Sequence, residues 1–573
     1  MKPLPFTSTE ELLNLGWDDI EPAYRALEKA ELNQDTVEPW LLEWTAVSNA
    51  VEEMYNRLYV ATSVNTADKE AEEKFNAFME NIFPKAAPAE QKLKSKFIES
   101  GLAVEGMRVP LRNMRVATEI FREENLALFI EEEKLSNEHD KIEGAQTVQW
   151  EGEETTVRQM EVVLRKNDRE IRRKGWELMA GRQLEDRETI NRQWVKFMEL
   201  RQKIADNAGL PSFREFRWKQ FNRFDYAPED SKTFQDGIRE AVVPAVQTLA
   251  ESRRKQLGLD SLRYYDLFVD VTGLPPLKPF SSVEELKRKA SGIFHKVLPA
   301  FGDYFDTLDR ENLLDIENRK NKAGGAYSID FPVAKKPFIF ANAVGIHDDV
   351  QTMLHESGHA FHAFESFGLP YYYQRSESAL PMEFAEVASM GMEYLALPYL
   401  EASQGGFYSE ADAARARVEH IWESIRFWPY MAIVDAFQHW AYENADGDGK
   451  DPDKCDQKWG VLEDLFRPYI DWRGYEDIKV TGWQRKHHIH QLPFYYVEYG
   501  LAQLGAVQIW RRALEDQACA VADYRKALAL GGTVPLPELF KTAGAKFAFD
   551  AGILQACADL MVDQFQKYEQ VYA

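Results

Sequence analysis

The sequence predicts a mainly α protein with one small β-sheet. Most of its 573 residues lie in stretches rich in Glu, Lys, Arg, Leu and Ala, with apolar residues three and four positions apart. This spacing is the period of an amphipathic helix. Strand-like patterns are sparse, and the longer one directly precedes a histidine-rich stretch, "LHESGHAFH" at residues 354–362. The fold class therefore follows from helical periodicity, few strand signals and a motif placed just after the sheet.

Two long segments illustrate the helical pattern, "ENLALFIEEEKLSNEHDKIE" (124–143) and "DRETINRQWVKFMELRQKIADNAG" (186–209). The second ends at Gly209, shortly before Pro211, which is a typical helix stop signal. Between the two helices, "GAQTVQWEGEETTVRQMEVVL" (144–164) begins with a pattern that predicts a short hairpin turning at Glu151-Gly152.

The second strand pattern is "GGAYSIDFPVAKKPFIFANAVG" (324–345), which has glycines at both ends and the apolar run Phe338–Phe340 inside. We place an exposed edge strand in "PFIFANAVG" (337–345). Such an edge can bind an extended peptide through backbone hydrogen bonds with little sequence preference. An ordinary buried strand explains the same residues equally well.

Charge and cysteine content limit the classes of function. The formal net charge is -25, from 69 basic and 94 acidic residues, which disfavours nucleic acid and anionic membranes as partners. Three scattered cysteines, Cys455, Cys519 and Cys557, fit a reducing compartment. The first residues lack the apolar core of a signal peptide, and no apolar run is long enough to span a membrane. We therefore expect a cytoplasmic protein, and its oligomeric state is left open.

The stretch "HESGH" fits the pattern H-E-x-x-H, with His355, Glu356 and His359. Residues four apart on a helix lie one above the other, so both imidazoles can reach one metal ion. The apolar residues Val350 and Met353 fall on the opposite side of this helix, and the preceding pair Asp348-Asp349 is read as its N-cap signal. A helix whose histidines only face solvent or the core is the alternative.

The third ligand is harder to choose. His362 shares the histidine face, but three imidazoles on one short helix converge poorly on a tetrahedral ion, so we interpret it as a supporting or structural residue. Catalytic zinc favours two histidines and one carboxylate. A second predicted helix, "PMEFAEVASMGMEYLALPYL" (381–400), starts at Pro381 and carries Glu383, Glu386 and Glu393 on one face. The spacing does not choose among these three.

Four motifs in order make the chain resemble a known family. "HESGHAFH" is followed about thirty residues later by "EFAEVAS", with "FPVAKKPFIFANAVGIHDDVQTMLHE" upstream and "HIHQLPFYYVEYGLAQLGA" downstream. Together they resemble the thimet-oligopeptidase family of zinc metallopeptidases, particularly its oligoendopeptidase F branch. The resemblance covers at least residues 320–505, and "IEGAQTVQWEGEETTVRQM" extends it toward the N-terminus.

The resemblance implies one catalytic zinc ion and a prolate, two-lobed helical fold with a deep substrate channel. It selects Glu386 as the third ligand beside His355 and His359. The expected activity is cleavage of internal bonds in short, unstructured peptides, because a narrow channel excludes folded proteins. Glu356 is the expected general base. His488, Tyr496 and Tyr499 are the expected donors to the oxyanion, although His487, His490 and Tyr495 lie close to them in sequence.

For domain organisation we expect an N-terminal helical region at 1–190 and a catalytic region at 191–573. Two other functions remain open. A helical zinc carboxypeptidase has the same ligands but needs a cation for the substrate's C-terminus, for which Arg375 and Arg485 are candidates by position. A non-catalytic peptide-binding protein is disfavoured because Glu356 is intact.

Overall fold

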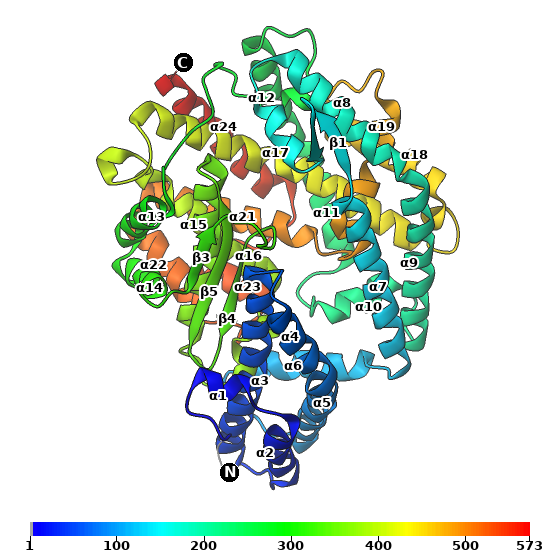
Figure 1. Ribbon diagram of the computed structural model, residues 1–573, viewed down its shortest axis with the longest axis vertical. Coiled ribbons are helices and arrows are strands. Elements are labelled where there is room, and N and C mark those ends of the chain that lie inside the picture. The colour runs from blue at the N-terminus through cyan, green and yellow to red at the C-terminus, as the bar shows by residue number, and fades with distance from the viewer. Residues whose placement is uncertain (1–3, 573) are drawn as a thin grey trace. The chain divides into compact units, whose positions relative to one another are not determined.

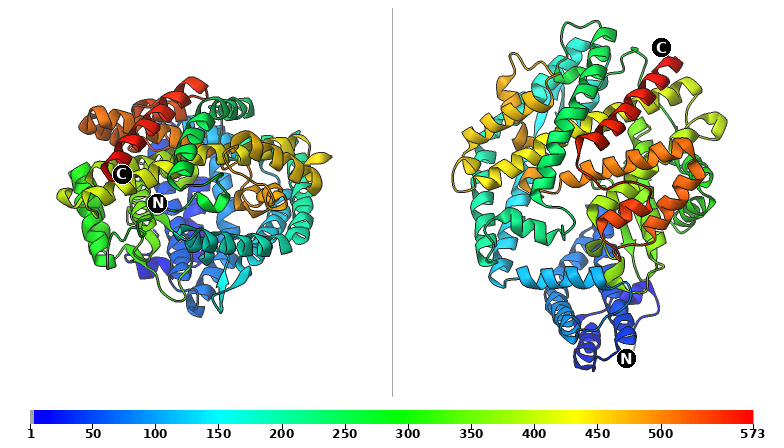
Figure 2. Two further views of the ribbon diagram at one scale, coloured as in Figure 1. Left: turned by 90° about the horizontal axis from the view of Figure 1, so that it is seen from above. Right: turned by 180° about the vertical axis from the view of Figure 1, so that it is seen from behind.

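The computed structural model describes residues 4–572, apart from the side chain of Glu377, and consists mostly of helices with two small sheets (Figures 1 and 2). The expected fold class, mainly α with a small sheet, is confirmed. The two-lobed shape, the channel and the division at residue 190 stay predictions.

Two compact units make up the chain, and each is assembled from three segments. The first contains residues 1–119, 278–413 and 505–547, and the second contains 120–277, 414–504 and 548–573. Each unit is described here by itself.

Along the chain, the helices of the first unit come both before and after the three strands of its sheet. Its helices are α1 (Thr9–Leu13), α2 (Trp17–Lys29), α3 (Val37–Val64), α4 (Lys69–Asn81), α5 (Phe83–Ser100), α6 (Arg108–Ile120), α13 (Val283–Val297), α14 (Pro299–Arg310), α15 (His347–Ser366), α16 (Met382–Ala396), α22 (Gln517–Leu528) and α23 (Leu536–Thr542). The strands are β3 (Leu314–Glu317), β4 (Tyr327–Phe331) and β5 (Lys336–Ala343).

The sheet order β3-β5-β4 corrects the sequence-based placement of the edge. β5 is the central strand, parallel to β3 and antiparallel to β4, so the segment 337–345 does not supply a free edge along its length. Its apolar residues from Pro337 to Ala341 are all buried, which is typical of a strand covered on both faces. The edges belong to β3 and β4.

Helix α3 supports the sheet from the N-terminal segment of the same unit. The Glu53 carboxylate accepts hydrogen bonds from the backbone N–H groups of Val333 and Ala334 at 2.6 and 2.9 Å, in the turn between β4 and β5. The Asn56 side chain donates to the backbone oxygen of Asp330 at 2.7 Å. The N-terminal helices therefore help to fix the strands that lead into α15.

The second unit contains the expected hairpin and the two long helices named above. Its elements are α7 (Glu124–Gly144), β1 (Thr147–Trp150), β2 (Glu153–Thr156), α8 (Arg169–Glu185), α9 (Arg187–Asn207), α10 (Phe213–Gln220), α11 (Pro228–Gly237), α12 (Val243–Gln256), α18 (Pro452–Phe466), α19 (Glu476–Val480), α20 (His487–His490) and α24 (Ala551–Tyr572). Two more helices are divided between the units, α17 (Glu410–Glu443) and α21 (Val497–Glu515), and the last residue of α6, Ile120, also belongs to the second unit.

Local turn chemistry explains these matches. Glu151 and Gly152 both have positive φ, 52° and 91°, as the tight turn of a two-residue hairpin requires. Gly209 has φ of 72° just after α9, the left-handed conformation in which helices commonly end. Glycine adopts it without a steric penalty.

Candidate active site

Helix α15 carries the H-E-x-x-H motif, and its first turn differs from the predicted cap. The N-cap residue is Ile346, whereas Asp349 is the third residue of the helix. Its carboxylate accepts hydrogen bonds from the backbone N–H groups of Val344, Gly345 and Ile346 at 2.9, 2.7 and 2.9 Å. A side chain at this position reaches back to the amides ahead of the helix, so Asp349 caps from inside it.

The structure brings His355, His359 and Glu386 together. The Nε2 atoms of His355 and His359 lie 3.4 and 3.6 Å from Oε2 of Glu386, and the three possible ligand atoms are all within 4.8 Å of one another. Two imidazoles and a carboxylate are the donor set that catalytic zinc takes in several peptidases. The residues therefore fit a zinc ion, although their role as ligands stays a prediction.

Hydrogen bonds behind this group orient its side chains. Nδ1 of His355 donates to Oε1 of Glu393 at 2.7 Å, which leaves Nε2 facing Glu386. The Ser389 hydroxyl donates to Oε2 of Glu386 at 2.9 Å. Carboxylates commonly hold metal-binding histidines in this way. Sequence reasoning named Glu393 only as a possible ligand, and its place two turns after Glu386 on the same face was the available signal.

A glycine inside the motif lets the two helices approach closely. A Cβ atom built on Gly358 would lie 2.5 Å from the backbone oxygen of Ala388 and 2.6 Å from Cα of Ser389. Both contacts are with the backbone of α16, which cannot turn aside as a flexible side chain can. Gly358 is therefore required for the approach that places Glu386 beside the histidines, and sequence analysis did not single it out.

Burial and mutual attraction set the charges within the group. Burial lowers the pKa of His359 to about 4. For His355 burial acts in the same direction, but hydrogen bonds to Glu386 and Glu393 outweigh it and raise its pKa well above the usual value. Burial also opposes the charge of Glu386, yet both histidines hold the pKa of that carboxyl down at about 2. The group thus keeps one carboxylate charged among imidazoles.

Glu356 follows His355 in the motif and is 7% exposed. Burial raises its pKa to about 7, while the neighbouring His355 acts in the opposite direction. A hydrogen bond from the backbone of Ser328 on β4 also reaches this carboxylate. A carboxyl group that is poised near neutral pH can both accept and release a proton, as a general base and acid must.

His362 is set apart from the group. Its ring lies 6.0 Å from that of Phe384, centroid to centroid, and it is 3% exposed. Burial lowers its pKa to about 3, so the imidazole is neutral. His362 is not among the three residues whose ligand atoms converge, which agrees with its interpretation as a supporting or structural residue.

The predicted oxyanion donors lie in the second unit, where their rings form a cluster. The ring centroids of His488 lie 4.9 Å from Tyr496 and 5.8 Å from Tyr499, and the two tyrosine rings are 5.6 Å apart. Because α21 begins at Val497, Tyr496 directly precedes the helix and Tyr499 lies in its first turn. Tyr495 also contacts Tyr499, at 5.4 Å.

The neighbouring histidines have other surroundings. His487 lies 3.6 Å from Asp140, and His490 is fully buried with its ring 4.4 Å from that of His139. The ring of His488, in contrast, contacts those of both Tyr496 and Tyr499, which supports its choice. Burial, with smaller effects of Lys486 and His487, lowers its pKa to about 3, so it is a neutral imidazole that can donate one N–H.

A second group with ligand chemistry comprises His139, Asp140 and Glu143 on α7. Asp140 already accepts a hydrogen bond from Gln491 at 2.6 Å, and the charge of Lys486 acts on Glu143. Burial raises the pKa of Glu143 to about 7, which favours its uncharged form, whereas a metal ligand has to be deprotonated. This group gives no support for a second metal centre.

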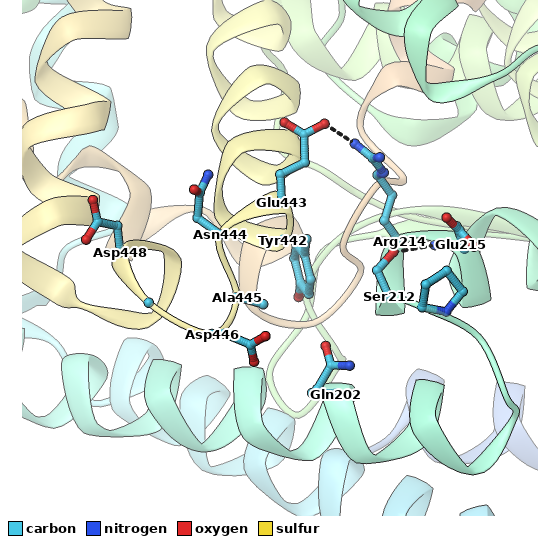
Figure 3. Close-up of a pocket in the computed structure, with 12 residues that line it drawn as sticks. Gln202, Ser212, Arg214, Glu215, Tyr442, Glu443, Asn444, Ala445, Asp446 and Asp448 are labelled. Carbon is cyan, nitrogen blue, oxygen red and sulfur yellow. Dashed lines mark hydrogen bonds and ion pairs between the residues drawn. The ribbon is translucent and has the colours of Figure 1, made fainter.

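The second unit also contains an open polar hollow of about 700 Å³, lined by the start of α10 and the end of α17 (Figure 3). Arg214 and Glu443 form an ion pair across it, and Lys232 reaches the same carboxylate. None of the predicted site residues lines this hollow. It is therefore not the candidate active site.

Comparison with known families supplies the identity of the fold. Residues 162–559 match the model of peptidase family M3, and residues 14–105 match the M3 N-terminal domain. The chain belongs to peptidase family M3. The resemblance to the oligoendopeptidase F branch is thereby confirmed, and the family places the chain among metallopeptidases.

Individual relatives agree with this assignment. The chain is 25% identical over 236 residues to the chromosomal oligoendopeptidase F of Lactococcus lactis subsp. cremoris, which covers 40% of this chain and 36% of the relative. It is 24% identical over 328 residues to the oligopeptidase PepF of Bacillus subtilis (strain 168), covering 55% and 45%. These matches span less than half the length of either curated relative.

A solved structure extends the similarity over the whole fold. Pz peptidase A, determined with an inhibitor, superposes with a TM-score of 0.86 at 26% identity, covering 98% of each chain. No helix within residues 4–572 has both the length and the apolar character needed to cross a bilayer.

Proposed function

We propose that this protein is a zinc-dependent oligoendopeptidase that hydrolyses internal bonds of short, unstructured peptides. The observation that carries the proposal is the convergence of His355, His359 and Glu386 within 4.8 Å, in a chain that belongs to a peptidase family. Names of the relatives, oligoendopeptidase F and oligopeptidase, support short peptides as the substrate class.

Under this proposal, His355, His359 and Glu386 hold one zinc ion. When bound, zinc acts as a Lewis acid and lowers the pKa of water toward 7. Glu393 keeps the His355 ring in the orientation that exposes Nε2, through its 2.7 Å hydrogen bond. Ser389 does the same for one oxygen of Glu386, at 2.9 Å.

Glu356 is proposed as the residue that moves protons. It takes a proton from the attacking water as the new C–O bond forms at the peptide carbonyl. It then passes that proton to the amide nitrogen as the C–N bond breaks, so the products are a carboxylic acid and an amine. Its burial supports this role, because a buried carboxylate is a stronger base than an exposed one.

His488, Tyr496 and Tyr499 are proposed as donors to the oxyanion that forms on the carbonyl. Their clustered rings and the neutral state of His488 support this role, since each can supply an N–H or O–H. Donors of this kind act by stabilising the charge that develops in the transition state.

The carboxypeptidase alternative receives little support from the two candidate cations. Arg375 is 4% exposed and donates to Asn49 at 3.2 Å. Arg485 donates to the backbone oxygen of Ile478 at 2.6 Å and to the hydroxyl of Thr481 at 3.1 Å. Both guanidinium groups are already engaged within their own units.

The test is a defined mixture of peptides from about 5 to 30 residues together with one folded protein, incubated with and without a chelator. Mass spectrometry then identifies every product. The length of the peptides that are cleaved shows whether a narrow channel limits the substrate. We expect internal cuts confined to the peptides and abolished by the chelator. Stepwise loss of single C-terminal residues would favour the carboxypeptidase, and no cleavage by metal-loaded protein would favour a binding protein.

A further inference from the structure

Phe494 has an unusual backbone conformation for a buried aromatic residue. Its φ is 68°, in the left-handed region, and its side chain is fully buried. The other non-glycine residues with positive φ between residues 4 and 572 are polar and not buried: Glu151, Asn222, Asn312, Asn321 and Lys335. Bulky residues rarely adopt this strained conformation, which persists only where surrounding contacts enforce it.

Two buried side chains hold both polar groups of the Phe494 backbone. Its N–H donates to Oε1 of Gln438 on α17 at 2.6 Å, and its carbonyl oxygen accepts from Nη2 of Arg223 at 2.6 Å. Gln438 is fully buried and Arg223 is 6% exposed. Because both its N–H and its carbonyl oxygen are hydrogen-bonded, the backbone of Phe494 cannot rotate without losing one of these bonds.

An ion pair with Glu498 fixes the Arg223 side chain. The Glu498 carboxylate lies 2.7 Å from Nη2 of Arg223, and both side chains are 1% exposed. Such an ion pair contributes little net stability because both charges lose their hydration, but breaking it leaves a buried charge. Glu498 itself is on α21, four residues after Phe494, so the pair ties the turn to the helix that follows it.

The ring of Phe494 packs against three other rings. It lies 5.0 Å from Tyr442 and 5.4 Å from His439, both on α17, and 5.9 Å from Trp218 on α10. The guanidinium of Arg223 lies over the Trp218 ring at 4.6 Å. The turn is therefore enclosed by residues far away in the sequence.

The position of this turn gives it a consequence for function. Phe494 lies between His488 and the pair Tyr496 and Tyr499 along the chain, and their rings meet at 4.9–5.8 Å. A change of φ at Phe494 redirects the chain that follows it and so separates these rings. Strain of this kind is found where a site has to be rigid before its ligand arrives.

We propose that Gln438, Arg223 and Glu498 are positioning residues that enforce the left-handed conformation of Phe494. They thereby fix His488, Tyr496 and Tyr499 relative to one another. This inference rests on the proposed function, in which these three residues donate to the oxyanion. Gln438 and Arg223 act through the backbone of Phe494, and Glu498 acts through Arg223.

The decisive variant is Gln438→Met, which keeps the shape of the side chain and removes the acceptor for the Phe494 N–H. We expect kcat for peptide hydrolysis to fall about 10- to 100-fold, as a small misplacement of catalytic groups does, with KM and zinc content unchanged. Gln438→Glu retains an oxygen acceptor and should recover most of kcat. Gln193→Met is the matched control, because this buried glutamine on α9 has no partner for its Oε1 within the described structure.

A second readout does not depend on activity. With 3-fluorotyrosine placed at position 499, ¹⁹F NMR should give one resonance in the wild-type sequence background and in Gln193→Met. A shifted or split resonance is expected in Gln438→Met. If Gln438→Met does not fold, Glu498→Gln replaces it, with an expected fall in kcat of about tenfold.

The outcomes separate this inference from the proposed function. Folded Gln438→Met with unchanged kcat and an unchanged resonance overturns the positioning role, as does an equal change in Gln193→Met. If the wild-type protein cleaves no peptide, the proposed function fails. If the ¹⁹F resonance at position 499 then still shifts only in Gln438→Met, the inference that Gln438 fixes the turn at Phe494 is supported.

Discussion

Two regions of the molecule carry the predicted functional residues, and they are built in different ways. His355, His359 and Glu386 stand on two regular helices, α15 and α16, and meet because helical repeats stack their side chains. His488, Tyr496 and Tyr499 lie on either side, in the sequence, of an irregular turn that contains the left-handed Phe494. The first region is specified by spacing within short segments, whereas the second depends on partners more than fifty residues away, such as Gln438.

This difference explains which contacts a local change can break. On α15 and α16 each predicted ligand is one side chain on a regular helix, so we expect a substitution to remove that side chain and to change little else. In the turn, one lost hydrogen bond changes the backbone and shifts several side chains together. Four substitutions test this contrast, in order of the effect expected.

Glu386→Gln should have the largest effect of the four, because it removes the charge of the proposed carboxylate ligand. We expect zinc affinity to fall by more than about 100-fold, which exceeds the loss typical of a residue that only hydrogen-bonds a metal ligand. Peptide hydrolysis should fall with it. Metal analysis after dialysis measures the first and product formation the second. Glu383→Gln, on the same helix and equally buried, is the control. Loss of zinc from that control instead would transfer the ligand role to Glu383.

Tyr499→Phe removes one hydroxyl from the second region and leaves its ring in place. We expect kcat to fall by about 10²- to 10³-fold, the usual effect of deleting one oxyanion donor, with zinc content unchanged. Steady-state kinetics with a single peptide gives kcat and KM. Tyr495→Phe is the companion variant, and a larger loss there would assign the donor to Tyr495.

Glu393→Gln weakens the support of His355 without removing a ligand. Gln keeps an oxygen that can accept from Nδ1 but loses the charge, so we expect zinc affinity to fall about 10- to 100-fold while saturating zinc restores hydrolysis. Competition with a chelating dye measures this affinity. Hydrolysis that stays low at saturating zinc would give Glu393 a different role.

Gly358→Ala tests the close approach of α15 and α16. The added methyl group meets backbone atoms at 2.5–2.6 Å, so we expect a loss of about 1–3 kcal/mol in the free energy of unfolding. Gly292→Ala on α13 is the control, since nothing lies within 4 Å of its Cβ position. There the better helix propensity of alanine should add up to about 1 kcal/mol. Equal effects in both variants would contradict the packing argument.

The same contrast governs how much the sequence could predict. Helix α15, the hairpin turn at Glu151-Gly152 and the end of α9 follow from local patterns, and all three are found. Spacing brought His355 and His359 to one face, but it could not choose Glu386 over Glu383 or Glu393. That choice depends on how α16 packs against Gly358, which is a tertiary contact.

Other features were missed for similar reasons. The apolar run of β5 could be an edge or a central strand, and only its pairing with both β3 and β4 decides the question. Asp349 was assigned to the cap because its type fits, whereas the structure uses it from inside the first turn. The left-handed Phe494 has no local signal at all, because phenylalanine does not favour that conformation.

In the proposed mechanism, α15 and α16 hold a metal ion while Glu356 acts on the substrate. The most direct test is to measure zinc content and peptide cleavage on the same samples of the wild-type protein and Glu356→Gln, with the exposed Asp348→Asn on the same helix as control. We expect about one zinc per chain in all three proteins, with cleavage reduced about 10²- to 10⁴-fold in Glu356→Gln alone. Full cleavage by zinc-loaded Glu356→Gln would contradict it.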